Sequence, residues 1–314
     1  MRILIACPAA AGARTGNRVT AARWCRLLRD LGHSARVVAD AGARPADLLV
    51  ALHATRSAAA IERFRSRSPL APLVVALVGT DLYSDLPRMG WRALEQAARL
   101  VALHPRAMRD LPRALRSRTR VILQSAVPPR PRPLLSRRHF DVSVVAHLRE
   151  VKDPFRAEEA VRDLPLDSRL RVRHVGGGLE RGMEDEARRR AAANPRYVWL
   201  GARPGWETRR EIARSRLLVL SSRSEGGANV ISEAIVSGVP VLSSRMACAE
   251  GLLGRDYPGL FPVGDTRALR DLLLRAEAEP AFLGKLRARC SRLRPLFAPA
   301  RERAAWRSLL AELV

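Results

Sequence analysis

Two carboxylates and two adjacent glycines occur together in residues 224–240, SEGGANVISEAIVSGVP. Glu225 directly precedes Gly226 and Gly227, and Glu233 follows eight positions after Glu225. Glycines at the start of a helix leave backbone N–H groups free to hold a phosphate, whereas carboxylates accept hydrogen bonds from hydroxyl groups. A nucleotide sugar satisfies both requirements, because its diphosphate lies between the hydroxyls of a sugar and those of a ribose.

The neighbouring residues indicate which elements hold this segment. The apolar run LLVLSS (217–222) ends just before it, and a helical pattern of apolar positions begins at Asn229. The segment is therefore expected at the carboxyl end of a strand. A plain strand–helix turn explains the glycines alone about as well, but the complete spacing E-G-x-x-N-x-x-x-E is more specific.

The first half of the chain alternates short apolar runs with helical patterns. Continuous apolar runs bounded by turn residues are typical of strands buried on both faces of a parallel sheet, and the alternation predicts a doubly wound α/β domain. The expected strands are 2–7, 35–40, 47–53, 72–79, 100–104 and 120–124, and the expected helices are 18–32, 57–67 and 90–98.

Residues 125–138 hold four prolines and are expected to link two domains. A second α/β series follows, and residues 279–314 are expected to be entirely helical. We predict an α/β protein of two Rossmann-like domains, 1–130 and 131–295, with a ligand cleft between them and a C-terminal helix, 296–314, that packs back towards the first domain. Ligands of such sheets bind at the carboxyl ends of the strands.

The composition limits the classes of function. A chain of 314 residues with 47% hydrophobic residues is long enough for two buried cores. The formal charge of +25 raises the alternative of a nucleic-acid-binding protein. However, the arginines are spread along the chain and aromatic residues are only 4%, which argues against a nucleic-acid platform. A basic surface still favours anionic small molecules.

The four cysteines, Cys7, Cys25, Cys248 and Cys290, show no C-x-x-C or metal-ligand spacing. They are expected to be free thiols of a cytoplasmic protein, with no metal site. LIAC (4–7) resembles a lipoprotein cleavage box, but only six residues precede its cysteine, so a buried strand explains it better. No apolar run approaches 18 residues, and membrane insertion is not expected.

The stretch SSRSEGGANVISEAIVSGVPVLSS closely resembles the C-terminal signature of glycosyltransferase family 4, which has the GT-B fold. The resemblance implies that Glu225 contacts the donor sugar, that the amides of Gly226 and Gly227 lie against the sugar and diphosphate, and that Glu233 binds the ribose. Asn229 and Val230 are assigned to the same donor site. The family usually has an aromatic residue and a proline after the first glycine. This chain has Gly227 and Ala228 there, so the shape of the sugar pocket is left open.

A second family element is VAHLREVKDP (145–154). The resemblance implies that Lys152 contacts the donor phosphates, and we expect Lys152, Arg149 and Glu225 to be catalytic. His147 replaces the usual arginine, and the sequence does not decide whether His147 or Arg149 makes that contact. Lys152 and Lys285 are the only lysines, which suggests that a compact ammonium is needed at Lys152, although Lys285 shows that a lysine can also occur by chance.

Three further donor residues come from the loops HVGGG (174–178) and LGARPGW (200–206). These loops match the family's strand-end loops near the nucleotide base. Gly176, Gly177 and Arg203 are the residues assigned to the donor there, and plain turns are the alternative.

The loop AGARTGNR (11–18) opens the first long helix. Gly16 and Asn17 can present N–H groups to an anion, with Arg14 and Arg18 close by. We assign Gly16 to the donor and the other three residues to the acceptor. A plain strand–helix turn is again the alternative.

Polar residues also follow two other strands of the first half. LHATRSA (52–58) contributes His53 and Arg56, and VGTDLY (78–83) contributes Thr80 and Asp81. All four are assigned to the acceptor, because carboxyl ends of neighbouring parallel strands meet at one edge of the sheet. A structural histidine is the alternative for His53, and a structural role is left open for Asp81.

The combination HATRSA, GTDLY and HLREVKDPF resembles a narrower group, the selenosugar synthases of selenoneine biosynthesis, over nearly the whole chain. It implies that selenophosphate displaces UDP from a UDP-sugar, with UDP-N-acetylglucosamine as the first choice, forms a carbon–selenium bond and then loses its phosphate. No cofactor is expected. A family 4 transferase with a hydroxyl acceptor and a sugar-nucleotide epimerase are the alternatives. The exact donor sugar, the stereochemical outcome, the step that removes phosphate and the oligomeric state are left open.

Overall fold

The computed structural model describes residues 1–10, 12–13, 15–41, 45–79, 81 and 88–313. The chain divides into two compact units. The first unit contains Met1–Gln124, Glu225–Gly227 and Pro299–Val314, and the second contains Ser125–Ser224 and Ala228–Ala298. These divisions fall at residues 124 and 298, whereas the sequence-based boundaries were placed at 130 and 295.

In the described part of the first unit, six parallel strands form a sheet in the order β2-β1-β3-β4-β5-β6. Every residue of β3 and of β4 is buried, as expected for strands covered on both faces. The strands are β1 (Arg2–Ala6), β2 (Ser34–Val38), β3 (Leu48–Leu52), β4 (Leu73–Leu77), β5 (Arg99–Ala102) and β6 (Thr119–Val121).

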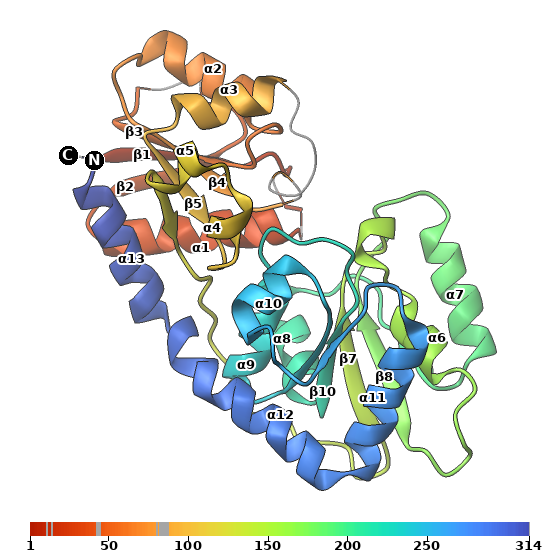
Figure 1. The fold of residues 1–314 in the computed structure, drawn as a ribbon. Helices are drawn as coiled ribbons and strands as arrows, with labels where there is room; N and C mark the ends of the chain where they lie inside the picture. The colour runs from red at the N-terminus through yellow and green to blue at the C-terminus, as the bar shows by residue number, and fades with distance from the viewer. Residues whose placement is uncertain (11, 14, 42–44, 80, 82–87, 314) are drawn as a thin grey trace. The chain divides into compact units, whose positions relative to one another are not determined.

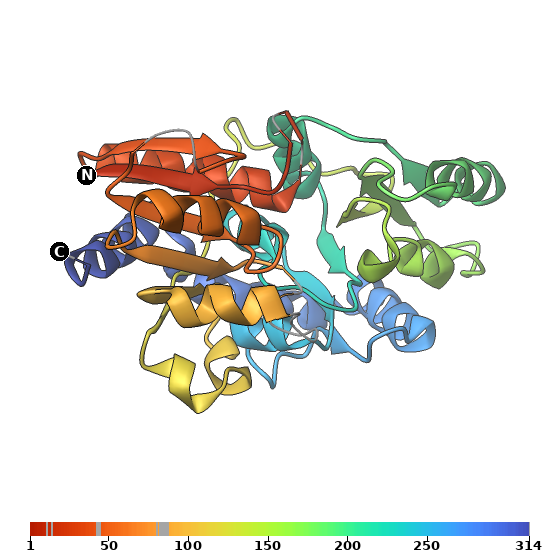
Figure 2. The same ribbon diagram turned by 90° about the horizontal axis from the view of Figure 1, so that it is seen from above.

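Helices cover both faces of this sheet (Figures 1 and 2). Because side chains alternate along a strand, Ile3 and Ile5 pack with α1 and α13, while Leu4 and Ala6 pack on the face covered by α2 and α3. The helices of this unit are α1 (Gly16–Asp30), α2 (Ala58–Arg67), α3 (Arg88–Gln96), α4 (Ala107–Asp110), α5 (Arg113–Arg116) and α13 (Pro299–Ala311).

The expectation that residues 279–314 are helical is confirmed for most of residues 280–311, with one interruption close to the expected boundary at residue 295. Helix α12 ends at Leu293, a 3-10 turn occupies Arg294–Phe297, and Ala298 is extended, with φ −72° and ψ 137°. Pro299 explains the extended Ala298, because proline disfavours helical geometry in the preceding residue. Pro295 contributes because it has no N–H for the helix ladder. Helix α12 consequently belongs to the second unit and α13 to the first.

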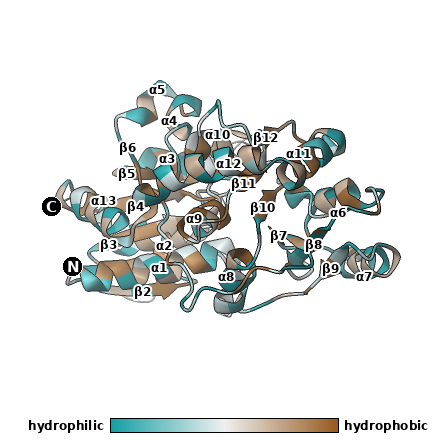
Figure 3. Ribbon diagram, turned by 90° about the horizontal axis from the view of Figure 1, so that it is seen from below, coloured by the Kyte–Doolittle hydropathy of each residue, from teal (hydrophilic) through white to brown (hydrophobic). Residues whose placement is uncertain are grey.

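The described part of the second unit holds another sheet of six parallel strands, in the order β12-β11-β10-β7-β8-β9. Strand β10 and helix α9 are among its most hydrophobic elements (Figure 3). The strands are β7 (Phe140–Val145), β8 (Leu170–Val175), β9 (Tyr197–Trp199), β10 (Leu217–Leu220), β11 (Val241–Ser244) and β12 (Leu260–Phe261). The helices are η2 (Glu150–Lys152), α6 (Arg156–Val161), α7 (Met183–Ala193), α8 (Gly205–Ala213), α9 (Asn229–Val236), α10 (Ala247–Leu253), α11 (Thr266–Ala278), α12 (Pro280–Leu293) and η3 (Arg294–Phe297).

The strand order of each sheet contains one point at which the chain changes direction across the sheet. In the second unit this switch point lies between β7 and β10, and in the first unit it lies between β1 and β3. In open α/β sheets, loops diverge at the switch point and leave room for a ligand at the carboxyl ends of the strands. The fold therefore marks one place in each unit where a ligand is expected.

The α/β class, the expected strands and the parallel pairing are confirmed. Helices α10 and α11 and strand β12 were not foreseen from the sequence. The proline-rich residues 125–138, all of which the structure describes, form no helix or strand. Among the described residues, no helix combines the length and the hydropathy needed to cross a bilayer.

We expect Trp306→Ala to destabilise the first unit by about 3–5 kcal/mol. Trp306 is 0% exposed and packs edge-on against Trp24, with ring centroids 4.8 Å apart. The indole N–H of Trp24 also donates to Glu302 of α13 at 2.7 Å, so the lost ring would loosen a buried polar contact as well. Urea unfolding followed by circular dichroism measures the loss. Arg301→Ala, an exposed truncation on the same helix, is the matched control, and equal stability of the two variants would contradict the expectation.

Candidate functional site

The turn that carries Lys152 lies directly beside the end of β10. Lys152 is half-buried and ends the short helix η2, which follows β7. The Arg223 N–H donates to the Val151 carbonyl at 2.9 Å, and the Ser221 hydroxyl donates to the Asp153 carbonyl at 2.8 Å. These bonds join the loops after β7 and β10 at the switch point of the second sheet. Arg223 lies two residues before Glu225, so Glu225 follows this junction within about 7 Å of chain.

The loop after β7 is also joined to the loop after β8. The Leu148 N–H donates to the Gly177 carbonyl at 3.0 Å, and the Gly177 N–H donates to His147 Nδ1 at 3.3 Å. A Cβ on Gly176 would lie 1.7 Å from the Ala146 carbonyl oxygen, so no other residue fits there. The Gly176 N–H donates to Gly201. Both predicted glycines thus use their amides within the unit, and their certain role is to let the loops pack closely.

His174, a residue of β8, stabilises this junction by a hydrogen bond to the end of β7. It was not identified from the sequence. It is 0% exposed, and its Nε2 lies 2.9 Å from the Ala146 carbonyl oxygen, so Nε2 carries the proton and donates. Nδ1 then accepts from the Tyr197 hydroxyl at 2.8 Å. Burial lowers the pKa of His174 to about 4. The ring is therefore neutral, and its two hydrogen bonds fix its position against Ala146, the residue that precedes His147.

The predicted residues Asn229, Val230 and Glu233 lie on α9, which begins at Asn229. Val230 is 9% exposed and belongs to the core, so any contact it makes with a ligand runs through its backbone N–H. Glu233 is half-buried one turn further along the helix. Glu225–Gly227 is grouped with the first unit, whereas the residues on either side of it belong to the second.

The two predicted arginines of the donor set are partly held by acidic residues. Arg149 Nε lies 3.6 Å from a carboxylate oxygen of Glu180, and Arg203 Nη1 lies 3.6 Å from Glu207. Arg203 also donates to the Leu200 carbonyl at 2.9 Å, so it folds back on its own loop. A shallow depression of about 540 Å³ lies beside Glu180, and its lining includes Gly178 and Glu184.

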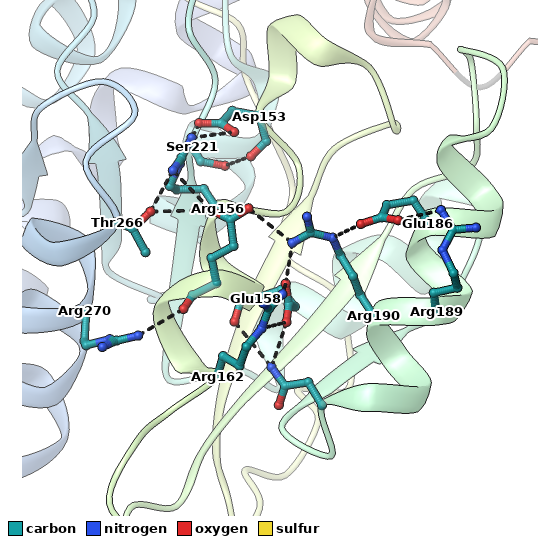
Figure 4. A network of polar contacts seen from close by, with 12 residues as sticks. Asp153, Arg156, Glu158, Arg162, Glu186, Arg189, Arg190, Ser221, Thr266 and Arg270 are labelled. Carbon is teal, nitrogen blue, oxygen red and sulfur yellow. Dashed lines mark hydrogen bonds and ion pairs between the residues drawn. The ribbon is translucent and has the colours of Figure 1, made fainter.

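A network of ion pairs extends from the residue after Lys152 (Figure 4). Arg156 binds both carboxylate oxygens of Asp153, at 2.8 and 3.2 Å, and Glu159 at 3.1 Å. Arg190 joins Glu159 at 3.1 Å to Glu158 at 2.7 Å. Burial raises the pKa of Glu158, but hydrogen bonds from Arg162, Asn194 and Arg190 outweigh it and leave the pKa below its usual value. Sequence reasoning missed this network, because its members are scattered over three helices.

The first unit has its own set of predicted residues. Gly16, Asn17 and Arg18 begin α1, next to the switch point between β1 and β3. The first amides of a helix lack partners within it, which suits an anion. Gly16 is exposed, and Asn17 and Arg18 are half-buried. Arg14 and Thr80 lie outside the described residues.

His53 and Asp81 lie together at the ends of β3 and β4. His53 Nδ1 is 3.8 Å from Asp81 Oδ2, and the two residues are 6% and 2% exposed. The carboxylate of Asp81 accepts from the amides of Ala54 at 3.0 Å and Gly79 at 2.9 Å, so it fastens both loops. Burial lowers the pKa of His53, against the opposing field of Asp81, and burial raises the pKa of Asp81. Arg56 is exposed, and its N–H lies 3.4 Å from His53 Nδ1.

A second buried histidine of this unit also escaped the sequence analysis. His104 follows β5, is 0% exposed, and accepts from the Ala107 N–H at 3.2 Å. Burial lowers its pKa to about 4. The sequence signal for both His104 and His174 is a histidine inside or directly after an apolar run.

Within each unit the structure therefore brings together several of the predicted residues. In the second unit, His147 contacts Gly177, and the Lys152 turn contacts the segment that leads to Glu225. In the first unit, His53, Asp81 and Arg56 are neighbours. The loop of Arg203 is joined to the loop after β8 through the Gly176 N–H and the Gly201 carbonyl, although the Arg203 side chain turns back to Leu200. Gly16 lies in the first unit, whereas the other donor residues from the loops after β7, β8 and β9 lie in the second.

Comparisons with known proteins bear on the family and the fold. The family model for glycosyl transferases group 1 matches residues 131–293. None of the curated proteins matches the sequence. Among solved structures, Anabaena HepE in complex with UDP has a TM-score of 0.76 and 16% identity, and the match covers 99% of this chain and 100% of that one.

Two other solved structures are similar over their whole length. Sucrose-phosphate synthase from Thermosynechococcus elongatus has a TM-score of 0.77 and 17% identity, with 99% of this chain and 98% of that one covered. A glycosyltransferase from Rickettsia africae has a TM-score of 0.75 and 12% identity, with the same coverage. At these identities the likeness concerns the fold, and it confirms the expected GT-B class.

We expect stability to fall on acidification because of His174. An unfolded histidine titrates near pH 6.5, whereas the folded His174 does so at about 4. Below pH 6.5 the unfolded chain takes up a proton that the folded chain refuses, so the contribution is complete above pH 6.5 and declines towards pH 4. Between pH 7.5 and 5.0 this residue should lower the free energy of unfolding by about 2 kcal/mol. His174→Gln should lose about that much less than the wild type in urea unfolding at the two pH values. Equal losses of stability in the wild type and in His174→Gln would refute the assignment of this pH dependence to His174.

Proposed function

This chain belongs to the glycosyl transferases group 1 family, and from that premise we propose that it transfers the sugar of a UDP-sugar. The observation that carries the proposal is the junction at the switch point of the second sheet. There the Lys152 turn is hydrogen-bonded to the segment that leads into Glu225. The choice of UDP is supported by the structural neighbour HepE, which was solved with UDP and with UDP-glucose.

Each donor group has a role that its chemistry suits. Lys152, with Arg149, faces the diphosphate and stabilises the negative charge that develops on UDP as it leaves. Glu225 accepts hydrogen bonds from the sugar hydroxyls, and Glu233 accepts them from the ribose. The backbone amides of Gly226 and Gly227 and those of the first turn of α9 donate to the diphosphate.

For the acceptor we propose selenophosphate, on the resemblance to the selenosugar synthases and on the chemistry of the first unit. Selenophosphate is a small, soft anion that is already deprotonated at neutral pH. It needs cationic and N–H donors to hold it, and little help from a general base. The amides at the start of α1, with Arg18 and the exposed Arg56, are donors of this kind.

The proposed reaction exchanges one bond at the anomeric carbon. A selenium electron pair of selenophosphate forms the C–Se bond while the C1–O bond breaks, and UDP departs with the electron pair of that bond. Attack of water at phosphorus then releases phosphate, and the Se–P electron pair remains on selenium. The first exchange consumes no proton, which is why an acceptor of this kind does not require a strong base in the site.

A hydroxyl acceptor, such as a glycan or lipid, is the second candidate. The pair His53–Asp81 favours it, because burial keeps His53 neutral and a neutral imidazole can accept a proton. Asp81 fixes the loops around this histidine through the amides of Ala54 and Gly79. Whether a base is needed therefore separates the two acceptors.

We expect Lys152→Ala and Glu225→Ala each to lower kcat for UDP-sugar turnover by about 100- to 1000-fold, because each removes a group that acts on the transition state. UDP release measured with a coupled assay gives the rates. Lys285→Ala is the matched control, since it removes the other lysine, which is exposed on α12. Retained activity in both Lys152→Ala and Glu225→Ala would overturn the donor site.

For the acceptor, purified protein is supplied with UDP-sugars, with and without selenophosphate, and the products are identified by mass spectrometry. We expect UDP release to depend on selenophosphate and the sugar product to gain selenium. UDP release that ignores selenophosphate but responds to a hydroxyl acceptor would favour the second candidate. A changed sugar still attached to UDP would instead indicate an epimerase.

A further inference from the structure

We propose that Asp153 and Arg156 form a positioning device for Lys152, in which Arg156 acts through Asp153 and touches no substrate. The inference rests on the proposed function of Lys152 at the donor phosphates. It adds two residues to that site, neither of which the sequence analysis assigned to it.

The backbone after Lys152 adopts a conformation that few residues tolerate. Asp153 has φ 44° and ψ 54°, in the left-handed region. A Cβ is disfavoured there, and aspartate and asparagine are among the side chains that accept it. The next residue is Pro154, which further restricts the conformation of Asp153. The backbone therefore turns sharply just after Lys152. The conformation of Asp153 sets the orientation of Lys152, the residue before it in this turn.

Asp153 is held at both its backbone and its side chain. The Ser221 hydroxyl donates to its carbonyl at 2.8 Å, while Arg156 binds its two carboxylate oxygens at 2.8 and 3.2 Å. The side chains of Asp153 and Arg156 are only 12% and 17% exposed, so this bidentate pair is screened less by water than a surface pair. Glycine would adopt the same φ freely but could not be fastened in this way.

Arg156 is itself fixed from other elements of the second unit (Figure 4). It donates to Thr266 of α11 at 2.6 Å and to Glu159 at 3.1 Å. Glu159 bonds Arg190 of α7, which bonds the fully buried carboxylate of Glu158 at 2.7 Å. The turn of Lys152 is therefore tied to α6, α7 and α11 through one guanidinium. This exceeds what a loop turn needs for closure and suits a group whose position must be exact.

The test compares Asp153→Ala, Arg156→Ala and the double variant in steady-state kinetics with a UDP-sugar. A misplaced leaving-group cation should lower kcat by roughly 10- to 100-fold with little change in KM. Because the two residues act as one pair, the double variant should be no slower than either single variant. Asp153→Asn and Arg156→Lys, which keep part of the pair, should be faster than the alanine variants but remain measurably slower than the wild type. Arg189→Ala, which removes an exposed ion pair on α7, should be neutral.

A second measurement reads the position of Lys152 without any turnover. The chain has only two lysines, Lys152 and Lys285, so reductive methylation with ¹³C-formaldehyde gives one resonance for each besides that of the N-terminus. We expect Asp153→Ala and Arg156→Ala to shift the Lys152 resonance and to leave Lys285 unchanged.

The outcomes separate the two proposals. An inactive wild type in which the Lys152 resonance still responds to Asp153→Ala would overturn the transferase assignment and support the positioning device. An unchanged Lys152 resonance, or unchanged kcat in an active protein, would overturn the device. If the alanine variants do not fold, Asp153→Asn and Arg156→Lys decide, since wild-type behaviour in both measurements then contradicts the proposal.

Discussion

The hydrogen bonds between the loops after β7 and β10 are the constraint on which the proposed donor site depends. The Val151 carbonyl and the Arg223 N–H meet at 2.9 Å, where the strand order of the second sheet changes direction. A parallel sheet leaves such a place open at its carboxyl edge. Two loops far apart in the sequence thereby become neighbours, one with the cation Lys152 and the other leading to the carboxylate Glu225.

The loops after β7 and β8 are held together by close packing instead of by charge. Gly176 has no room for a side chain beside the Ala146 carbonyl, and the neutral ring of His174 donates to that same carbonyl. These contacts fix the end of β7 from one side. Arg156 and Asp153 fix the following turn from the other. The site thus combines a tightly packed backbone with a small number of paired charges.

Much of this could be predicted from the sequence. The apolar runs indicated nearly every strand, since buried parallel strands need continuous hydrophobic residues. The motif around Glu225 and the position of Lys152 led to the proposed donor residues, which stay a prediction. Arg203 was placed in the site by its loop alone, whereas in the structure it donates back to Leu200. The interruption at Ala298 lies close to the boundary expected at residue 295, and Pro295 and Pro299 are its signal in the sequence.

Other features could not be predicted, because they depend on contacts between distant residues. The buried carboxylate of Asp81 accepts a hydrogen bond from the Ala54 N–H, which lies in the loop after another strand, β3. The network of Glu158 and Arg190 joins α6 to α7 and has no local pattern. His174 looked like one residue of a strand, and its role in fixing the end of β7 follows only from its two hydrogen-bond partners.

The central claim is that Lys152 and the segment after β10 hold one nucleotide diphosphate. Calorimetric titration of the protein with UDP tests it most directly, because it needs neither the sugar nor the acceptor. The account predicts saturable binding that weakens at least about tenfold in Lys152→Ala, equivalent to about 1.4 kcal/mol, and is unchanged in Lys285→Ala. Absence of UDP binding by the folded wild type, or equal affinity in all three proteins, would contradict it.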